Sequence, residues 1–379
     1  MSLRDDLDRI ARTAIDGGRI VGSVVIVCHR GASIYQAAHG WADRENGRPM
    51  NIDTMFRLSS LTKPIIAACI LAQVKCGLLH LDHAVSDFFP AFTPCMPDGS
   101  MPPITVRHLL THTSGLGLDV SRLASDGQDP GRIEMAYYHR SLEQVVRLHG
   151  GSTLRFTPGM AWAYSRSYDV LGAIAALLAD DTLEGAVEKF VTRPLGMRDT
   201  GFRVTDRSRL ATAYADGATQ PVRMRDPHVL PDPWGGQTIF HPDRIFDGQA
   251  FLSGSDGMIG TASDYMLLLE SLWRGRTPFG KSGAAEALSN QTPHLPHAVA
   301  PGWQFCLIGA WLDHPALAGS PASAGTARWG GVFGHSWFID QVAQLSAVSM
   351  TNTGLEGSDG LFPNEIRDAV YKNLRIRDA

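Results

Sequence analysis

The chain has 379 residues, of which 44% are hydrophobic and 19% charged, enough to bury a large core in one big domain or in two that share a boundary. Its formal net charge of -4 and sequence pI near 6.4 leave no basic surplus. No run of Lys and Arg is interleaved with aromatic residues either, which argues against nucleic acid as a partner.

Three features of the sequence predict a cytoplasmic protein. The first residues, Met1 to Asp6, lack the basic and then apolar pattern of a secretory signal. The longest helical apolar stretch, Ile65 to Val74, is about half of the ~20 residues that span a bilayer, so we expect no membrane segment. The five cysteines are scattered and lack a Cys-x-x-Cys spacing, which is typical of free thiols in a reducing compartment.

Helices and strands follow one another in a clear order along the chain. Apolar residues recur with a helical period over residues 3–15, and two apolar runs joined by a short turn then predict antiparallel strands at 23–28 and 33–38. Helical patterns follow at 65–74, 106–112 and 142–148. Residues 219–247 are rich in Pro and Gly and are interpreted as a long ordered loop.

The remainder of the chain begins with a helix that Thr261 caps, with Asp264 completing the capping pattern. Strands are then expected at 304–311, 328–333, 337–342 and 345–351, and a helix at 362–374. This order predicts an α/β fold in which an antiparallel sheet is flanked by helices and carries an inserted all-α domain. We expect residues 1–58 and 248–379 to build the sheet domain and residues 59–247 the mainly helical one, with the active site at their interface.

A serine and a lysine stand three residues apart at the start of the apolar helix. Ser60 and Lys63 therefore share a helix face, within hydrogen-bond reach of each other. A helix N-terminus favours oxyanion character, and a lysine amine that is partly neutral can activate a serine. The spacing alone occurs in many helices by chance, so it needs support from other motifs.

That support comes from three ordered motifs. Ser60-Leu-Thr-Lys63, the stretch Ile104 to Gly115 (Ile-Thr-Val-Arg-His-Leu-Leu-Thr-His-Thr-Ser-Gly), and Pro158 to Gly172 with its Tyr164-Ser all resemble the serine β-lactamase and penicillin-binding-protein superfamily. Within it, the chain is most similar to family VIII carboxylesterases, which look like class C β-lactamases but favour simple esters. The resemblance extends from about Arg4 to the last helix.

The resemblance implies a role for Tyr164, which would shuttle a proton between Ser60 and the leaving alcohol. Class C enzymes carry Tyr-x-Asn at this point, whereas here Arg166 occupies the third position. A guanidinium cannot accept a hydrogen bond from Lys63, so the resemblance assigns no role to Arg166.

The Lys-Thr-Gly element of the superfamily is absent from the sequence. Trp329-Gly330-Gly331 stands at the expected place, as in family VIII esterases, and replaces a cation that would hold a β-lactam carboxylate with an apolar surface. The glycines would let substrate approach the backbone. By the same correspondence, the oxyanion hole would use the N–H groups of Ser60 and Val332.

For the remaining candidate site residues, both a role in the site and a structural role stay open. His335 either lines the pocket or is a structural histidine, and Trp162 and Trp234 are either substrate walls or core aromatics. His108 and His112 have a spacing seen in zinc sites, but no third ligand motif accompanies them, so we expect helix-packing roles and no metal.

These observations predict a serine carboxylesterase that hydrolyses short-chain acyl esters through a Ser60 acyl-enzyme, with no cofactor and a small-molecule ester as its partner. The alternatives are a β-lactamase or D-alanyl carboxypeptidase acting on amides, and an acyltransferase that uses the same acyl-enzyme. A non-catalytic binding protein on the same fold is disfavoured because both Ser60 and Lys63 are present. The oligomeric state stays open.

Overall fold

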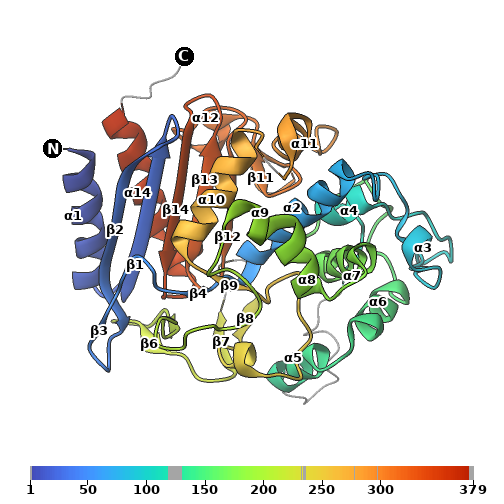
Figure 1. Cartoon of the computed structure of the whole chain (residues 1–379), viewed down its shortest axis with the longest axis horizontal. Helices are drawn as coiled ribbons and strands as arrows, with labels where there is room; N and C mark the ends of the chain where they lie inside the picture. Colours follow the sequence, from blue (N-terminus) through green and yellow to red (C-terminus); the bar gives the residue numbers. More distant parts are fainter. Residues whose placement is uncertain are drawn as a thin grey trace.

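The computed structural model describes residues 2–117, 130–231, 233, 236–276, 278–296 and 298–374. Its centre is an eight-stranded antiparallel sheet with the order β10-β11-β12-β13-β14-β1-β2-β3 (Figure 1). The strands are β1 (Gly22–His29), β2 (Ala32–Asp43), β3 (Arg48–Pro49), β10 (Trp303–Phe305), β11 (Ala310–Leu312), β12 (Ala327–Gly331), β13 (His335–Asp340) and β14 (Leu345–Thr351). Residues from the beginning and the end of the sequence thus meet where β1 pairs with β14.

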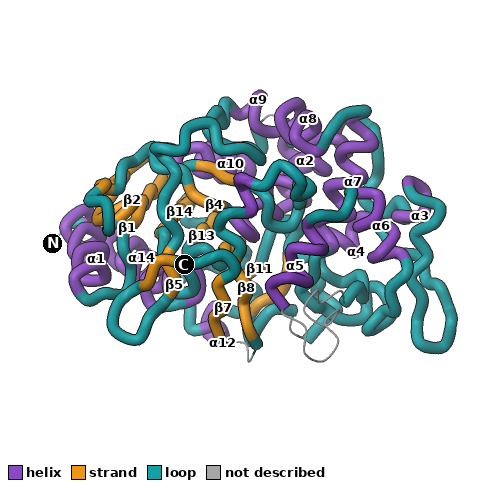
Figure 2. The backbone as a smooth tube through the Cα atoms, turned by 90° about the horizontal axis from the view of Figure 1, so that it is seen from below, coloured by secondary structure: helices purple, strands orange, loops and turns teal. Residues whose placement is uncertain are grey.

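Both faces of this sheet are covered, and the side chains of β1 show it directly. Successive side chains of a strand point to opposite faces. Val25 and Val27 pack into one apolar cluster, which also holds residues of α1 (Leu3–Asp16) and α14 (Leu361–Leu374). Val24 and Ile26 belong to the other cluster, with residues of α10 (Ala262–Trp273). Figures 1 and 2 place α1 and α14 together on one face and α10 on the other.

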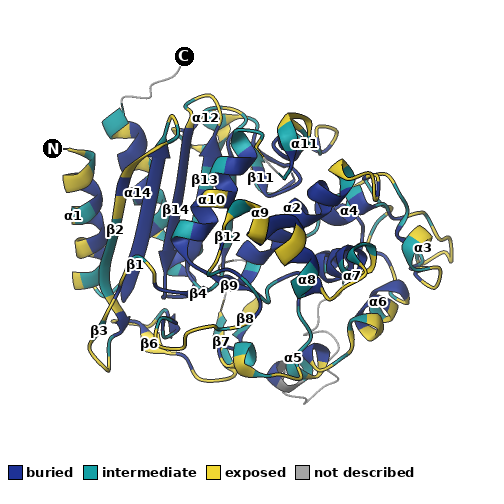
Figure 3. Cartoon of the chain, viewed as in Figure 1, coloured by how far each residue is buried: buried dark blue, intermediate teal, exposed yellow. Residues whose placement is uncertain are grey.

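A group of helices lies beyond the β10–β12 side of the sheet. At its centre is α2 (Thr62–Lys75), which is buried along nearly its whole length, as Figure 3 shows by its dark colour. Around it lie α3 (Val85–Phe88), α4 (Val106–Leu110), α5 (Pro130–Tyr138), α6 (Leu142–Gly150), α7 (Ser167–Ala179), α8 (Leu183–Val187) and α9 (Arg193–Leu195). A π-helical turn, Glu188–Thr192, joins the last two. Three shorter helices occur in the C-terminal part of the chain: α11 (Gly280–Ala287), α12 (Pro315–Ala318) and α13 (Glu356–Asp359).

Short strand pairs connect the sheet to the helices. β4 (Phe56–Arg57) pairs with β9 (Ile259–Gly260), and β5 (Tyr214–Ala215) pairs with β6 (Val222–Arg223). The segment 219–247, expected to be a loop, also contains a hairpin of β7 (His228–Pro231) and β8 (Gln237–Phe240). The prolines exclude a long element there but permit a strand pair this short.

The predicted fold class is confirmed: an antiparallel sheet flanked by helices, with a mainly helical region between its N-terminal and C-terminal strands. One expected strand, 304–311, is instead two strands, because Cys306 donates its N–H to Gly309 and turns the chain between them. The domain boundaries at 58/59 and 247/248 stay a prediction. Among the described helices, none combines the length and apolar character needed to cross a membrane.

Candidate active site

Ser60 lies in a 3-10 turn, Ser59–Leu61, that leads directly into α2. The preceding residue, Ser59, has a φ of 49°, a left-handed conformation that is strained for a residue with a side chain. The buried apolar body of α2 anchors the turn, with Leu61 and Ile65 fully buried. The serine is therefore held at the start of a rigid helix, with its side chain facing a cavity.

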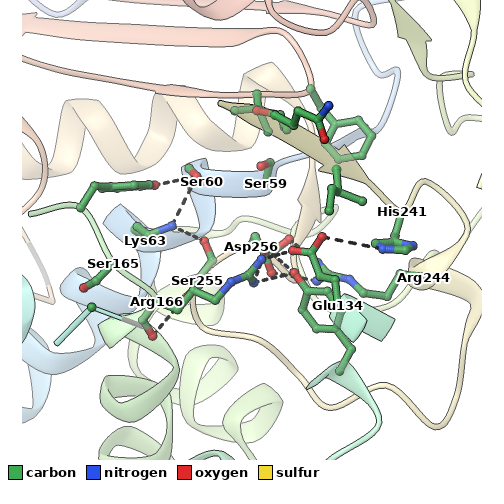
Figure 4. A pocket seen from close by; sticks show the side chains of 18 of the residues that line it. Ser59, Ser60, Lys63, Glu134, Ser165, Arg166, His241, Arg244, Ser255 and Asp256 are labelled. Atoms are coloured by element: carbon green, nitrogen blue, oxygen red, sulfur yellow. Dashed lines mark hydrogen bonds and ion pairs between the residues drawn. The ribbon is translucent and has the colours of Figure 1, made fainter. Parts of the chain in front are cut away.

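Lys63 lies one turn further along, and its side chain is almost fully buried. Its Nζ atom donates to Ser60 Oγ at 3.3 Å and to the backbone carbonyl of Ser255 at 2.8 Å. Figure 4 shows the Nζ atom between these two acceptors. Ser255 belongs to a turn, Ser253 to Gly257, that precedes β9 in the chain.

Tyr164 reaches Ser60 from the opposite side, in the segment before α7. Its hydroxyl donates to Ser60 Oγ at 2.7 Å, and Lys63 Nζ lies 4.7 Å from the centre of its ring. The tyrosine is 43% exposed, so its phenol stands at the rim of the site where a substrate can meet it. The structure thus brings together the serine, lysine and tyrosine that the motifs had indicated.

The end of β12 comes very close to the turn that carries Ser60. A Cβ atom built on Gly331 would lie 2.6 Å from the carbonyl oxygen of Leu58, so only glycine allows this approach. Val332 follows at the cavity wall. Within the described part of the chain, the N–H groups of Ser60 and Val332 donate no hydrogen bond, which leaves both free for a substrate oxygen.

Two of the predicted tryptophans lie beside Tyr164. The ring of Trp329 is 5.5 Å from the Tyr164 ring, and Trp162 stacks on it at 6.4 Å. Both also contact Phe305, at 5.3 Å and 5.6 Å. Both rings pack against the ring of Tyr164, and neither lines the cavity next to Ser60. Trp234 lies outside the described residues.

His335 does not line the cavity. It is 1% exposed, and its Nε2 is 2.8 Å from the carbonyl oxygen of Arg57, to which it donates. Burial lowers the pKa of His335 to about 4, so the ring is neutral at ordinary pH. Of the two alternatives for this histidine, the geometry supports the structural one.

His108 and His112 do not share a helix face. The helix α4 ends at Leu110, and His112 adopts a left-handed conformation with a φ of 57°. Among the described residues, no group of His, Cys, Asp or Glu is arranged to hold a metal ion.

A cavity of about 370 Å³ opens beside Ser60, and its lining is largely polar. Ser60, Lys63, Tyr164 and Val332 form one wall, and residues of the β7–β8 hairpin, Gln237 to Ile239, form another. Seven further lining residues are charged or can carry a charge or proton: Glu134, Tyr138, Arg155, Arg166, His241, Arg244 and Asp256. Sequence reasoning found only Arg166 among these.

Arg166 is the centre of a network on this side of the cavity (Figure 4). Its guanidinium pairs with Glu134 and, at 3.2 Å, with Asp256, and it donates to the Tyr138 hydroxyl at 2.6 Å. Arg244 pairs with the other oxygen of Asp256 at 2.9 Å. Burial opposes a charged Asp256, but Arg244 and Arg166 outweigh it and hold the pKa of this carboxyl far below its usual range.

Comparisons with known proteins identify the family of this chain. A family model described as Beta-lactamase matches residues 7–371. The chain belongs to the beta-lactamase family. Esterase EstB from Burkholderia gladioli is 42% identical over 374 residues, which cover 98% of this chain and 95% of EstB.

Solved structures with a similar fold superimpose well on this chain. EstCE1, described as a hydrolase with promiscuous acyltransferase activity, matches with a TM-score of 0.89 and 40% identity, covering 97% of this chain and 98% of its own. The simvastatin synthase LovD from Aspergillus terreus matches with a TM-score of 0.75 at 21% identity, covering 99% and 100%, which supports the fold alone. The predicted resemblance to the serine β-lactamase and penicillin-binding-protein superfamily is confirmed.

Proposed function

We propose that this chain is a serine carboxylesterase of the family VIII type that hydrolyses esters with short acyl chains. The observation that carries the proposal is the position of Ser60 Oγ, which contacts Lys63 Nζ at 3.3 Å and the Tyr164 hydroxyl at 2.7 Å. The esterases EstB and EstCE1, both at or above 40% identity over nearly the whole chain, support ester hydrolysis.

Acylation would begin when Lys63, as a neutral amine, takes the proton of Ser60. The alkoxide attacks the ester carbonyl, and the negative charge on the carbonyl oxygen is stabilised by the free N–H groups of Ser60 and Val332. As the tetrahedral intermediate collapses, Tyr164 gives its proton to the departing alcohol and recovers one from Lys63. The product of this step is an acyl group on Ser60.

Deacylation repeats the same transfers with water. Tyr164 and Lys63 take a proton from the water, which attacks the acyl carbonyl and forms a second oxyanion. Collapse of this intermediate returns the proton to Ser60 Oγ and releases the acid. Each role is assigned to a side chain or backbone group of this protein, and the proposal requires no metal or organic cofactor.

The test is hydrolysis of p-nitrophenyl acetate and butyrate by Ser60→Ala and Lys63→Ala. We expect either substitution to remove at least ~10³-fold of kcat, since residues that act as a unit are comparably damaging when removed singly. Retention of a large fraction of activity by Ser60→Ala would exclude Ser60 as the nucleophile. A fluorophosphonate probe should label wild type and leave Ser60→Ala unlabelled.

Amide hydrolysis, as in a β-lactamase or D-alanyl carboxypeptidase, is the first alternative. The absence of the Lys-Thr-Gly element disfavours it, because Trp329 stands in place of the lysine and no cation is offered there to the carboxylate of a β-lactam. We expect nitrocefin turnover to be far slower than turnover of p-nitrophenyl butyrate. Comparable kcat/KM values for the two would favour the amidohydrolase.

An acyltransferase is the second alternative, and the described activity of EstCE1 favours testing it. The same acyl-enzyme would pass its acyl group to an alcohol instead of water. Measuring the ratio of new ester to free acid with an added alcohol separates the two outcomes. The cytoplasmic location remains a prediction from the sequence.

A further inference from the structure

We propose that His112 is a positioning residue that holds Tyr164 against Ser60. The inference rests on the role proposed above for Tyr164 and extends it. The sequence predicts only a helix-packing role for this histidine, but its ring packs directly on the ring of Tyr164. His112 touches neither Ser60 nor the cavity, so it would act only through Tyr164.

His112 forms hydrogen bonds with both neighbours of Tyr164. Its backbone carbonyl accepts the N–H of Ala163 at 3.0 Å. Its ring Nδ1 accepts the N–H of Ser165 at 3.3 Å. The backbone on each side of Tyr164 is therefore fixed to one residue, which limits how the phenol can move relative to Ser60.

The ring of His112 also packs on the phenol itself. Their ring centres are 4.7 Å apart, and the rings of Trp162, Tyr168 and Phe305 surround the other sides of the imidazole at 5.3–6.0 Å. The histidine is 1% exposed, so this contact lies in the interior of the protein. The left-handed backbone at His112 turns the side chain into this position just after α4 ends at Leu110.

The protonation state fits this role. Burial holds the pKa of His112 well below its usual value, so the ring stays neutral. Because Nδ1 accepts from the Ser165 N–H, the single ring proton resides on Nε2. A neutral imidazole keeps its acceptor at Nδ1 and adds no positive charge beside Lys63.

Two substitutions separate the functions of the ring. His112→Phe keeps a ring against Tyr164 and removes the acceptor for Ser165. His112→Asn keeps an acceptor near the position of Nδ1 and suits the left-handed backbone, since Asn tolerates that conformation better than most residues. Thermal unfolding of each variant shows whether it is folded at the assay temperature.

We expect His112→Phe to lower kcat for p-nitrophenyl butyrate by about 10- to 100-fold while KM changes less than about threefold, because a small displacement of a catalytic group lowers the rate of the chemical step. His112→Asn should recover most of that loss. A folded His112→Phe variant with wild-type kcat, or an Asn variant no better than Phe, would overturn the inference.

The decisive measurement is a double-mutant cycle with Tyr164→Phe. If His112 acts through Tyr164, the double variant should be no slower than Tyr164→Phe alone, whereas independent effects would multiply. Multiplied effects would overturn the inference and leave the proposed esterase mechanism intact. Wild-type kcat in Tyr164→Phe would instead reject the role of Tyr164 and, with it, that of His112.

Discussion

Lys63 donates a 2.8 Å hydrogen bond to the carbonyl oxygen of Ser255, a residue almost two hundred positions later in the chain. The same Nζ atom lies 3.3 Å from Ser60 Oγ, so this carbonyl fixes the direction in which the amine faces the serine. Class C enzymes carry an asparagine two residues after the tyrosine. Here Arg166 occupies that position, and a guanidinium cannot accept a hydrogen bond from Lys63. The backbone of the 253–257 turn supplies the acceptor for the lysine instead.

A buried carboxylate holds that turn in place, and its removal should impair catalysis. Asp169 is fully buried, and it accepts the Ser253 hydroxyl at 2.7 Å and the Ser255 N–H at 3.0 Å. Asp169→Ala should free the Ser255 carbonyl to move and lower kcat by at least ~10-fold. The measurement is kcat and KM for p-nitrophenyl butyrate at a temperature where the variant is folded.

Asp264→Ala is the matched control for this substitution. Asp264 is also buried and accepts a backbone N–H, from Asp199 at 2.7 Å, and a hydroxyl, from Thr200 at 3.0 Å, but it does not line the cavity. Its loss should lower the melting temperature and leave kcat of the folded enzyme near wild type. An equal loss of kcat in both variants would argue that Asp169 has only a general structural role.

The close approach of β12 to the Ser60 turn predicts that Gly331→Ala is strongly damaging. The new Cβ would lie 2.6 Å from the backbone oxygen of Leu58, and a backbone atom cannot move aside as a flexible side chain can. We expect a loss of about 1–3 kcal/mol in unfolding free energy and a drop in kcat, because Val332 would shift with the strand. Gly248→Ala, where a Cβ meets no atom within 4 Å, should leave both near wild type. A fully active Gly331→Ala enzyme would contradict the proposed oxyanion hole.

Replacing Arg166 with the asparagine of class C enzymes should destabilise this protein rather than improve β-lactam turnover. The guanidinium pairs with Glu134 and Asp256 at the cavity wall, where all three side chains are 10–20% exposed, so removing it should cost up to about 3 kcal/mol, the lower end of the range for a buried pair. The measurement is denaturant unfolding of Arg166→Asn, with nitrocefin turnover assayed alongside.

Arg166→Asn combined with Glu134→Gln should recover part of that stability, since the carboxylate left without its partner is then neutral. If the single variant is as stable as wild type, the network contributes little to folding. A large gain in nitrocefin turnover would show that Arg166 itself excludes β-lactams.

Buried neutral histidines should make the protein less stable in mild acid. The pKa of His335 is lowered by burial from its ordinary 6.5 to about 4, so between these values the unfolded chain binds a proton that the folded chain does not. Stability therefore falls as pH decreases through this window, by about 2 kcal/mol for His335 between pH 7 and pH 5. His149, whose pKa is likewise lowered to about 4 by burial, adds to the effect.

Denaturant unfolding at pH 7, 6 and 5 measures this slope. His335→Gln cannot titrate, so its unfolding free energy should depend less steeply on pH even if its absolute stability is lower. An identical slope in wild type and His335→Gln would mean that His335 is already protonated, or accessible, in the folded protein.

The predicted helices and strands that rest on local periodicity agree with the structure to within a few residues. The helix at 3–15 is α1, the apolar run at 65–74 lies inside α2, and the strands at 337–342 and 345–351 correspond to β13 and β14. Errors arose where a local signal was weak. The run at 304–311 reads as one strand because the turn inside it carries no proline and only one glycine, Gly309.

Within the site, the sequence itself determined the pair of Ser60 and Lys63, since residues three apart on a helix must share a face, and the motif order indicated Tyr164 and Val332. Only the tertiary structure decided the acceptor for Lys63, the ionic network around Arg166 and the hydrogen bonds of His112 with the neighbours of Tyr164. The physical reason is that the residues in contact lie far apart along the sequence. These contacts join segments from 32 to 192 positions apart, where no spacing rule applies, and folding of the chain brings them within hydrogen-bond distance.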